Sequence, residues 1–302
     1  MKTLKQLGEF NFIRAIAKGC VNHKSVVKGI GDDAAVVRLE KNLFLLFTTD
    51  MLIEDVHFKR NQAARFIGHK AIACSISDIA AMGGVPRYAL VSVAFPKNLK
   101  ASIALDIYRG MHKTAKKFGL SIIGGDTNSA HKIIINVSMC GVAVGKKFIL
   151  RNGACTGDFV FVTGRLGGSH AGRHLKFLPR LKEARFLVER YPVNAMIDIS
   201  DGLISDLGHI IEMSKKGAVL WQENIPVSPD AKTLEDAYYQ GEDFELLFTV
   251  PQSCADDLKR RWPFKKVKLT CIGEITTEGK GLRIKDVKGK LRKAKGLGWR
   301  HF

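Results

Sequence analysis

Apolar residues along the first half of the chain fall into short runs and into longer, helically spaced runs. The short runs are rich in branched and aromatic residues and end at turn formers, which is typical of strands. They predict strands over 25–30, 34–39, 42–50, 88–95 and 120–125, and one long strand or a pair over 132–145. The longer runs predict helices over 7–19, 64–84 and 101–119.

The pattern of apolar runs is interrupted by the polar, glycine-bearing stretch 146–158, which we interpret as a domain boundary. Beyond it the pattern predicts strands over 159–164, 195–200, 244–251 and 267–275. An amphipathic helix is expected over 201–217, and another is expected to open within 167–175. The fold class is therefore α/β of the α+β type, with two lobes at 1–145 and 146–302.

Composition agrees with a folded globular chain. Its 302 residues are 46% hydrophobic and 25% charged, which lies outside the disordered and fibrous classes. No apolar run approaches the roughly 18 residues that span a bilayer, and the N-terminus lacks the pattern of a cleaved leader. The six cysteines are scattered singly, without CxxC pairs. We expect a cytoplasmic protein with reduced cysteines and no membrane partner.

The net charge of +19 raises the question of nucleic-acid binding. Residues 259–302 carry 15 Lys and Arg against 3 acids, a net +12, and hold most of the excess. Aromatic residues do not interleave with these basic residues as they do in a single-strand stacking surface. A solvated basic face is favoured over a nucleic-acid partner, and an anionic substrate would also profit from such a field.

Acidic residues are scarce in the first 130 positions, where ten occur, and most of the seven named next lie just beyond an apolar run. Seven of the ten are Asp32, Asp33, Asp50, Glu54, Asp55, Asp78 and Asp126. If several converge at strand ends they need a counter-ion, and Mg²⁺ is the natural one because it takes carboxylate and nucleotide phosphate oxygens. Asp198 and Asp201 repeat the pattern around Ser200. The alternative is that these residues only form turns and helix caps.

Phosphate-binding signatures of the common kinds are absent, since there is neither GxxxxGK[ST] nor GxGxxG. The segment TGRLGGSHAG, 163–172, follows an expected strand and opens an expected helix. Such a turn aims backbone N–H groups at an anion. A glycine-rich connection required only by packing explains the segment equally well.

Seven motifs in order resemble those of thiamine-monophosphate kinase, a family within the aminoimidazole ribonucleotide synthetase superfamily. They are GIGDDAAV, TTDMLIEDVHF, SDIAAMGGVP, IIGGDT, RNGACTGDFVFVTG, MIDISDGLISDLGHI and GEDFELL. The resemblance implies a two-lobed fold of the aminoimidazole ribonucleotide synthetase type, with a dimerising sheet in the N-terminal lobe and a C-terminal α/β lobe. It also implies a homodimer, ATP bound with several Mg²⁺ between the lobes, and direct in-line phosphorylation of thiamine monophosphate to thiamine diphosphate.

The same resemblance implies roles for individual residues. Its metal ligands are Asp33, Thr48, Thr49, Asp50, Asp78, Asp126, Asp198 and Asp201. Its ATP-binding residues are Tyr108, Gly125, Asp126, Arg151 and Ser200. Its substrate-binding residues are His57, Glu242 and Trp299, and its catalytic residues are Asp50, Asp126 and Asp201.

The local pattern offers plainer interpretations for three of these residues. His57 lies between apolar neighbours and is typical of a packed histidine, Arg151 is consistent with a surface charge, and Glu242 with the start of a strand. The chain also departs from the family pattern. Asp55 stands where the family has glycine, Gly296 stands where it has a stacking aromatic, and the stretch between Gly172 and Pro179 is short.

Two other functions compete with this one. The first is a different ATP-dependent enzyme of the same superfamily acting on another small substrate. Its selenide-using members favour a reactive cysteine in a glycine-rich N-terminal segment, for which Cys20 is the only candidate. The second is a basic nucleotide-binding or nucleic-acid-binding protein without kinase activity, whose binding would weaken steeply with salt.

Overall fold

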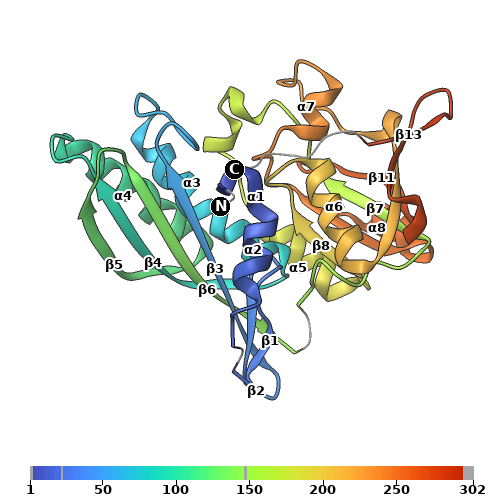
Figure 1. The fold of residues 1–302 in the computed structure, drawn as a ribbon, viewed down its shortest axis with the longest axis horizontal. Coiled ribbons are helices and arrows are strands. Elements are labelled where there is room, and N and C mark those ends of the chain that lie inside the picture. Colours follow the sequence, from blue (N-terminus) through green and yellow to red (C-terminus); the bar gives the residue numbers. More distant parts are fainter. Residues whose placement is uncertain (1–2, 22, 146–147, 295–302) are drawn as a thin grey trace.

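Two sheets lie side by side in the computed structural model, which describes residues 3–21, 23–145 and 148–294 (Figure 1). Within these residues the first sheet has six strands in the order β1-β2-β3-β6-β4-β5. The strands are β1 (Val26–Lys28), β2 (Ala35–Glu40), β3 (Leu43–Ile53), β6 (Ile134–Val144), β4 (Val85–Phe95) and β5 (Ser121–Ser129). All neighbours are antiparallel except β4 and β5.

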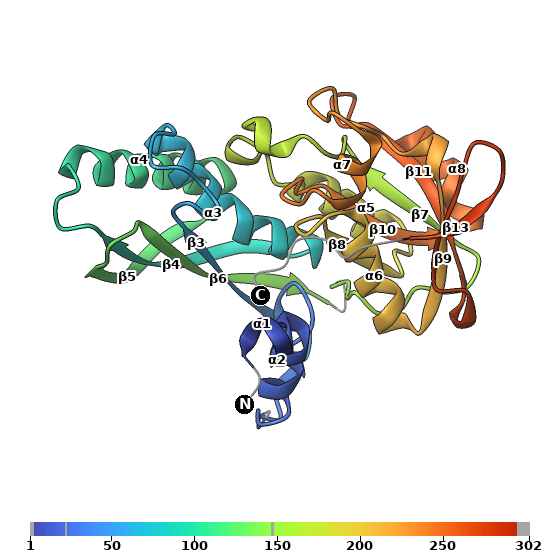
Figure 2. The ribbon, with the colours of Figure 1, turned by 45° about the horizontal axis from the view of Figure 1, so that its top comes forward.

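Two long helices, α3 (Ala64–Ala81) and α4 (Ala101–Phe118), cover one face of the first sheet (Figure 2). Side chains along β3 alternate between that face and the opposite one: Phe44 and Leu46 are buried, whereas Phe47 and Met51 are exposed. This is the period-two pattern of a sheet with one covered face.

The second sheet has seven strands among the described residues, in the order β13-β12-β9-β11-β7-β10-β8. They are β13 (Leu291–Lys293), β12 (Leu282–Lys285), β9 (Lys216–Trp221), β11 (Leu269–Thr277), β7 (Asp158–Thr163), β10 (Leu246–Pro251) and β8 (Ala195–Asp198). Its helices are α5 (Leu181–Arg190), α6 (Leu203–Ser214), α7 (Leu234–Tyr239) and α8 (Gln252–Arg261). Near the N-terminus, α1 (Leu4–Leu7) is followed by α2 (Glu9–Ala17), which lies beside α6, where Arg14 pairs with Glu212 at 2.6 Å.

Helix α3 joins the two lobes, because it is buried on nearly all sides. Lys70, Cys74, Ser77 and Ala81 recur at helical spacing along one of its faces. Lys70 and Ser77 make hydrogen bonds to residues of the second lobe, and Cys74 and Ala81 belong to apolar clusters with second-lobe side chains. The helix therefore presents one continuous stripe to the second lobe.

The two-lobed α/β architecture expected from the sequence is confirmed, with several local corrections. Of the two alternatives for residues 132–145, the single strand is confirmed as β6, which spans Ile134–Val144; β5 runs on past Asp126 to Ser129. The helix expected within 167–175 is instead two 3₁₀ turns, Ser169–Ala171 and Arg173–Leu175, each flanked by left-handed glycine. The helix expected to close at a glycine ends at Lys215 in the left-handed conformation, and Gly217 lies in β9.

Short elements of the second lobe were not predicted, among them α5, α7, α8, β9, β12 and β13. The strands of the two sheets end at Val144 and resume at Asp158, and the boundary at 145 stays a prediction. Among the described residues, no helix combines the length and the apolar character needed to cross a membrane.

Candidate active site

Three of the acids singled out in the sequence meet where the lobes join. Asp33 comes from the loop after β1, Asp78 from α3 and Asp198 from the end of β8. Each offers a carboxylate oxygen, and these oxygens all lie within 4.8 Å of one another. We call Asp33, Asp78 and Asp198 the acidic cluster.

Hydroxyl groups orient the carboxylates at and beside the acidic cluster. Ser77 Oγ donates to Asp198 Oδ2 at 2.5 Å, and Thr48 Oγ1 donates to Asp78. Asp50, on β3, accepts from Ser75 Oγ at 2.6 Å. The sequence interpretation missed Ser75 and Ser77, although polar residues within the apolar run ACSISD were the available signal.

Burial raises the pKa of each carboxyl group in the acidic cluster, and neighbouring carboxylates add to the shift in Asp78 and Asp198. The pKa of Asp198 rises to about 8. Burial also raises the pKa of Asp50, although hydrogen bonds with Ser75 and Asp78 oppose the shift. The Asp198 carboxyl therefore holds a proton at neutral pH unless a cation replaces it, and burial favours the protonated form of the other three carboxyl groups as well.

The adjacent acids Asp32 and Asp33 have different surroundings. Asp32 accepts from the Arg151 backbone N–H at 3.1 Å and lies 3.6 Å from Lys28 Nζ. Asp33 Oδ1 accepts from Arg151 Nη2 at 2.7 Å, whereas its Oδ2 is buried with no hydrogen-bond partner among the described residues. A buried carboxylate oxygen without a donor, beside two other carboxylates, fits a hard cation such as Mg²⁺.

Asp201 belongs to a second group, in which it offers an oxygen within 4.8 Å of ligand atoms from Asp206 and His209. Asp206 Oδ2 accepts from the backbone N–H groups of Asp201 and Gly202, both at 3.1 Å, and so fixes the turn that begins α6. Ser200 lies in that turn, and its carbonyl accepts from the Glu242 N–H at 2.7 Å. Asp206 and His209 were not singled out from the sequence.

The remaining expected ligands divide between the two faces of the first sheet. Thr48 and Asp50 hydrogen-bond to α3 on the covered face. Thr49 bonds to Ser138 Oγ at 3.1 Å, on the exposed face. By register, Asp126 lies on that same exposed face.

Asp126 is also distant from the acidic cluster within one chain. Across the sheet, Asp50 aligns with Val137, Val137 with Val91, and Val91 with Gly125, the neighbour of Asp126. Three strand spacings of about 4.8 Å put Gly125 about 14 Å from Asp50. Tyr108, on α4, is half-buried against the first-lobe core.

The expected substrate residues His57 and Glu242 are brought together through Lys70. His57 Nδ1 accepts from the Ile53 N–H at 3.0 Å, while its carbonyl accepts from Lys70 Nζ at 2.7 Å. Glu242 pairs with the same ammonium at 2.5 Å. Trp299 and Gly296 lie outside the described residues.

Glu242 belongs to the segment 241–246, in which three acids each pair with a cation. Glu242 pairs with Lys70, Asp243 pairs with Arg173 at 2.6 Å, and Glu245 pairs with Arg180 through two hydrogen bonds. We call Glu242, Asp243 and Glu245 the paired acids.

The backbone at Glu242 and Phe244 is left-handed, with φ of 63° and 51°, which is uncommon for residues with a Cβ. These pairs therefore hold a strained backbone in place.

The glycine-rich turn after β7 uses its donors internally. Gly167 N–H donates to Asp243 Oδ2 at 2.9 Å, and Gly168 N–H donates to Gln240 Oε1 at 2.8 Å. A Cβ at Gly167 would lie 2.7 Å from the Ala237 nitrogen, and one at Gly168 would lie 2.3 Å from the Asp230 carbonyl carbon. The packing interpretation of this segment is therefore favoured over the anion-binding one.

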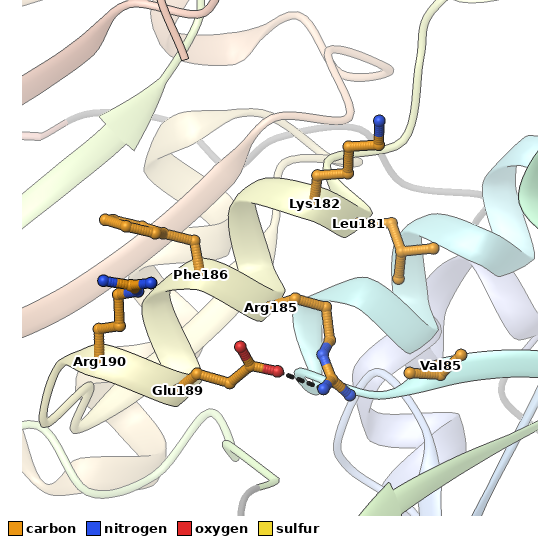
Figure 3. A pocket seen from close by; sticks show the side chains of 7 residues that line it. All are labelled: Val85, Leu181, Lys182, Arg185, Phe186, Glu189 and Arg190. Carbon is orange, nitrogen blue, oxygen red and sulfur yellow. Dashed lines mark hydrogen bonds and ion pairs between the residues drawn. The ribbon is translucent and has the colours of Figure 1, made fainter. Parts of the chain in front are cut away.

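A surface pocket of about 400 Å³ lies elsewhere, between Val85 and α5 (Figure 3). Arg185 and Glu189 form an ion pair at its rim, and Leu181 and Phe186 supply apolar surface. None of the expected site residues that the structure describes lines this pocket. The acidic cluster and the segment 241–246 remain the candidate active site.

Residues 31–143 match the family model described as AIR synthase related protein, N-terminal domain. Together with the acidic cluster between two lobes, this match defines a protein of the AIR synthase related class. The thiamine-monophosphate kinase of Buchnera aphidicola from Schizaphis graminum is 38% identical over 97% of this chain and 99% of its own length. That of Aquifex aeolicus is 35% identical over 99% of both chains. The chain belongs to the thiamine-monophosphate kinase family.

Solved structures agree with this assignment. AaThiL complexed with AMPPCP and TMP superposes with a TM-score of 0.86 at 34% identity, covering 100% of this chain and 99% of that one. The thiamine monophosphate kinase of Aquifex aeolicus gives a TM-score of 0.80 at 33% identity, covering 97% and 100%. The E. coli hydrogenase maturation protein HypE, at 19% identity and a TM-score of 0.72 over 96% and 98% of the two chains, shares the fold.

Proposed function

We propose that this chain is a kinase that uses ATP and Mg²⁺ to convert thiamine monophosphate into thiamine diphosphate. The observation that carries the proposal is the acidic cluster, formed at the lobe junction of a chain that aligns with thiamine-monophosphate kinases along nearly its whole length. The relative AaThiL was solved with AMPPCP and TMP, which are an ATP analogue and this acceptor.

Mg²⁺ is assigned first to Asp33, Asp78 and Asp198, with Thr48 and Asp50 alongside. The partnerless Asp33 Oδ2 and the raised carboxyl pKa values fit this assignment. Thr49, Asp126 and Asp201 complete the proposed ligand set at positions outside the acidic cluster. When bound, Mg²⁺ supplies the positive charge that lets two polyanions approach each other.

The protein's own contribution is to position the two substrates. An oxygen of the acceptor phosphate attacks the γ-phosphorus of ATP, the bond from that phosphorus to the β–γ bridging oxygen breaks, and ADP leaves. This in-line transfer needs no covalent phospho-enzyme. Arg151, which is proposed to bind ATP, forms an ion pair with Asp33. Its guanidinium stays charged, because the nearby carboxylates outweigh the effect of burial and raise its pKa.

ATP is proposed to lie between Arg151 and Ser200 at the lobe junction and Tyr108 and Gly125 on the first lobe. Catalysis is assigned to Asp50, Asp126 and Asp201. His57 and Glu242 are proposed to hold the thiamine part of the acceptor, with Trp299 as a further contact. The lobe boundary near residue 145 and a cytoplasmic location belong to the same proposal, and the free state of all six cysteines supports that location.

A homodimer through the uncovered face of the first sheet also belongs to the proposal. Phe47, Met51, Tyr88 and Leu90 share that face by register, and each is exposed by 44% to 53%. Contiguous exposed apolar side chains of this kind mark interaction surfaces. Thr49 and Asp126 lie on the same face, so dimerisation would place them at or near the interface. Light scattering should give twice the mass of one chain. A monomer at micromolar concentration would contradict the proposed homodimer.

The test of the activity is to incubate the purified chain with ATP, Mg²⁺ and thiamine monophosphate and to measure thiamine diphosphate. We expect product with Mg²⁺ and none when a chelator is added. Free thiamine, which lacks the phosphate, serves as the control acceptor and should give none. Absence of product from a chain that still binds ATP would contradict the proposed function.

A further inference from the structure

Lys70 is a fully buried ammonium group in the middle of the candidate active site. It lies on α3, and its side chain has no exposed surface. Its Nζ donates to Glu242 Oε1 at 2.5 Å and to the His57 carbonyl at 2.7 Å, and it lies 2.9 Å from His174 Nδ1. Lysine is almost never buried in this way without partners, and here the Glu242 carboxylate and the His57 carbonyl accept two of its three donor hydrogens.

The three residues around the Lys70 ammonium come from segments far apart in the sequence and from both lobes. The loop that carries His57 belongs to the first lobe, whereas His174 and Glu242 belong to the second. Glu242 has the left-handed φ of 63°, and its carbonyl accepts from Ser169 Oγ at 2.6 Å. Lys70 therefore fixes the position of Glu242 relative to the His57 loop across the lobe junction.

A metal ion is the competing explanation for this group of residues. His170, His174 and Glu242 offer ligand atoms within 4.8 Å of one another, and two histidines with a glutamate suit Zn²⁺. However, the Lys70 ammonium is already within hydrogen-bonding distance of His174 and Glu242. A divalent ion would have to enter beside this buried positive charge. The cluster is thus complete with its own cation.

We propose that Lys70 is a positioning residue for the acceptor, holding the His57 loop and Glu242 at the separation that the thiamine part of the substrate requires. The inference rests on the proposed function, which assigns His57 and Glu242 to that substrate. Lys70 and Asp78 lie eight residues apart on one helix, which is about 12 Å along its axis. The rigid helix thereby also sets the distance from the acceptor-holding pair to the acidic cluster.

The test compares Lys70→Met with Lys116→Met, a substitution of an exposed lysine on α4. In Lys70→Met, KM for thiamine monophosphate should rise about tenfold or more, since small displacements of binding groups have large effects. KM for ATP should stay within about twofold, because the acidic cluster is untouched. Lys116→Met should match the wild type in both constants.

A rise in KM for thiamine monophosphate alone distinguishes a positioning role from general destabilisation, which would weaken the binding of both substrates. If Lys70→Met does not fold, Lys70→Arg keeps the charge but not the shape, and should raise KM for thiamine monophosphate in the same direction. An unchanged KM for the acceptor in a folded Lys70 variant, or an equal rise for ATP, overturns the inference while the wild-type activity stands. A wild type that makes no thiamine diphosphate overturns the proposed function and this inference with it.

Discussion

Two regions along α3, one around Asp78 and one around Lys70, neutralise their buried carboxylates in opposite ways. Around Asp78, the acidic cluster brings one oxygen from each of three carboxylates within 4.8 Å of the others, and no described residue donates to the buried Asp33 Oδ2. Around Lys70, the segment 241–246 also gathers three acids, but Lys70, Arg173 and Arg180 neutralise them. Arg151 pairs with one of the three carboxylates in the acidic cluster, whereas each of the paired acids has a cation of its own.

The difference shows which region is built to receive a cation. Buried charge is costly unless it is paired, so each region must obtain its counter-charge from somewhere. The paired acids obtain it from side chains that the fold supplies, and they serve to hold a backbone shape. The acidic cluster can obtain it only from protons, from Arg151 or from an external ion. Mg²⁺ is therefore expected at the acidic cluster and not at the paired acids.

The largest expected effect is on catalysis in Asp78→Asn. Turnover should fall by about two orders of magnitude or more, because a charged group that organises the transition state is removed. The Mg²⁺-free protein should stay as stable as the wild type, since asparagine resembles the protonated acid and still accepts from Thr48. Turnover assays and thermal unfolding check both parts.

The matched control is Asp256→Asn, which alters a fully exposed acid on α8. It should leave turnover and stability unchanged. Full activity in Asp78→Asn would contradict the assignment of the acidic cluster.

The second-largest effect is expected on stability, when Lys70 is replaced. Lys70→Met leaves Glu242 without its ammonium partner and should lower the free energy of unfolding by about 3–5 kcal/mol. The double variant Lys70→Met/Glu242→Gln should recover part of that loss, because no unpaired charge remains. Urea denaturation of the wild type, both single variants and the double variant measures the coupling. Strictly additive changes would show that the two side chains do not interact.

The contributions of the two regions to folding stability should also change with pH in opposite directions. Burial raises the pKa of Glu242, but the hydrogen bond with His174 and the charge of Lys70 outweigh burial and lower the pKa to about 2. That contribution to stability is complete above the ordinary pKa of 4.5 and is lost as the pH falls toward 2. The acidic cluster has raised pKa values, so without Mg²⁺ its contribution declines as the pH rises from the ordinary value of 3.8 through about 8.

Mg²⁺ reverses the second trend, because it binds the deprotonated carboxylates. The rise in Tm produced by Mg²⁺ should therefore be larger near pH 8 than near pH 5, because the pKa of Asp198 is about 8 and Mg²⁺ must displace its proton at the lower pH. Thermal unfolding with and without Mg²⁺ across this range provides the check. A Mg²⁺ effect independent of pH would place the ion away from the acidic cluster.

The smallest effect is expected in Asp55→Gly, in the loop that Lys70 holds. Asp55 has a φ of 68°, which lies in the left-handed region that glycine adopts without strain. Glycine removes the backbone strain but loses the ion pairs with Lys59 and Lys132, at 3.6 and 3.2 Å. The two changes oppose each other, so Tm should move by no more than about 2 °C. Asp55→Val, which cannot relax the same backbone, should lower Tm further.

Much of the acidic cluster could be predicted from the sequence, because its acids follow apolar runs within ordered motifs. Strand alternation could also have separated Thr48 from Thr49, since neighbours in a strand face opposite ways. Asp32 and Asp33 could not be separated, because their surroundings depend on the distant Arg151.

Lys70 was beyond the sequence interpretation for a similar reason. A lysine within a helical run is usually solvated, and its burial arises from three segments up to 172 positions apart in the chain. The short elements α7, β12 and β13 were missed because runs of three to six residues carry little periodicity. Asp126 was expected near the other acids, and only the register of four strands puts it on the opposite face.

The most direct test of the contrast between the two regions is a crystal structure of the full chain with a non-hydrolysable ATP analogue, Mg²⁺ and thiamine monophosphate. We predict Mg²⁺ bound by Asp33, Asp78 and Asp198, and the thiamine part of the acceptor beside His57 and Glu242 with Lys70 still paired. Metal bound by His170, His174 and Glu242, with the acidic cluster empty, would contradict it.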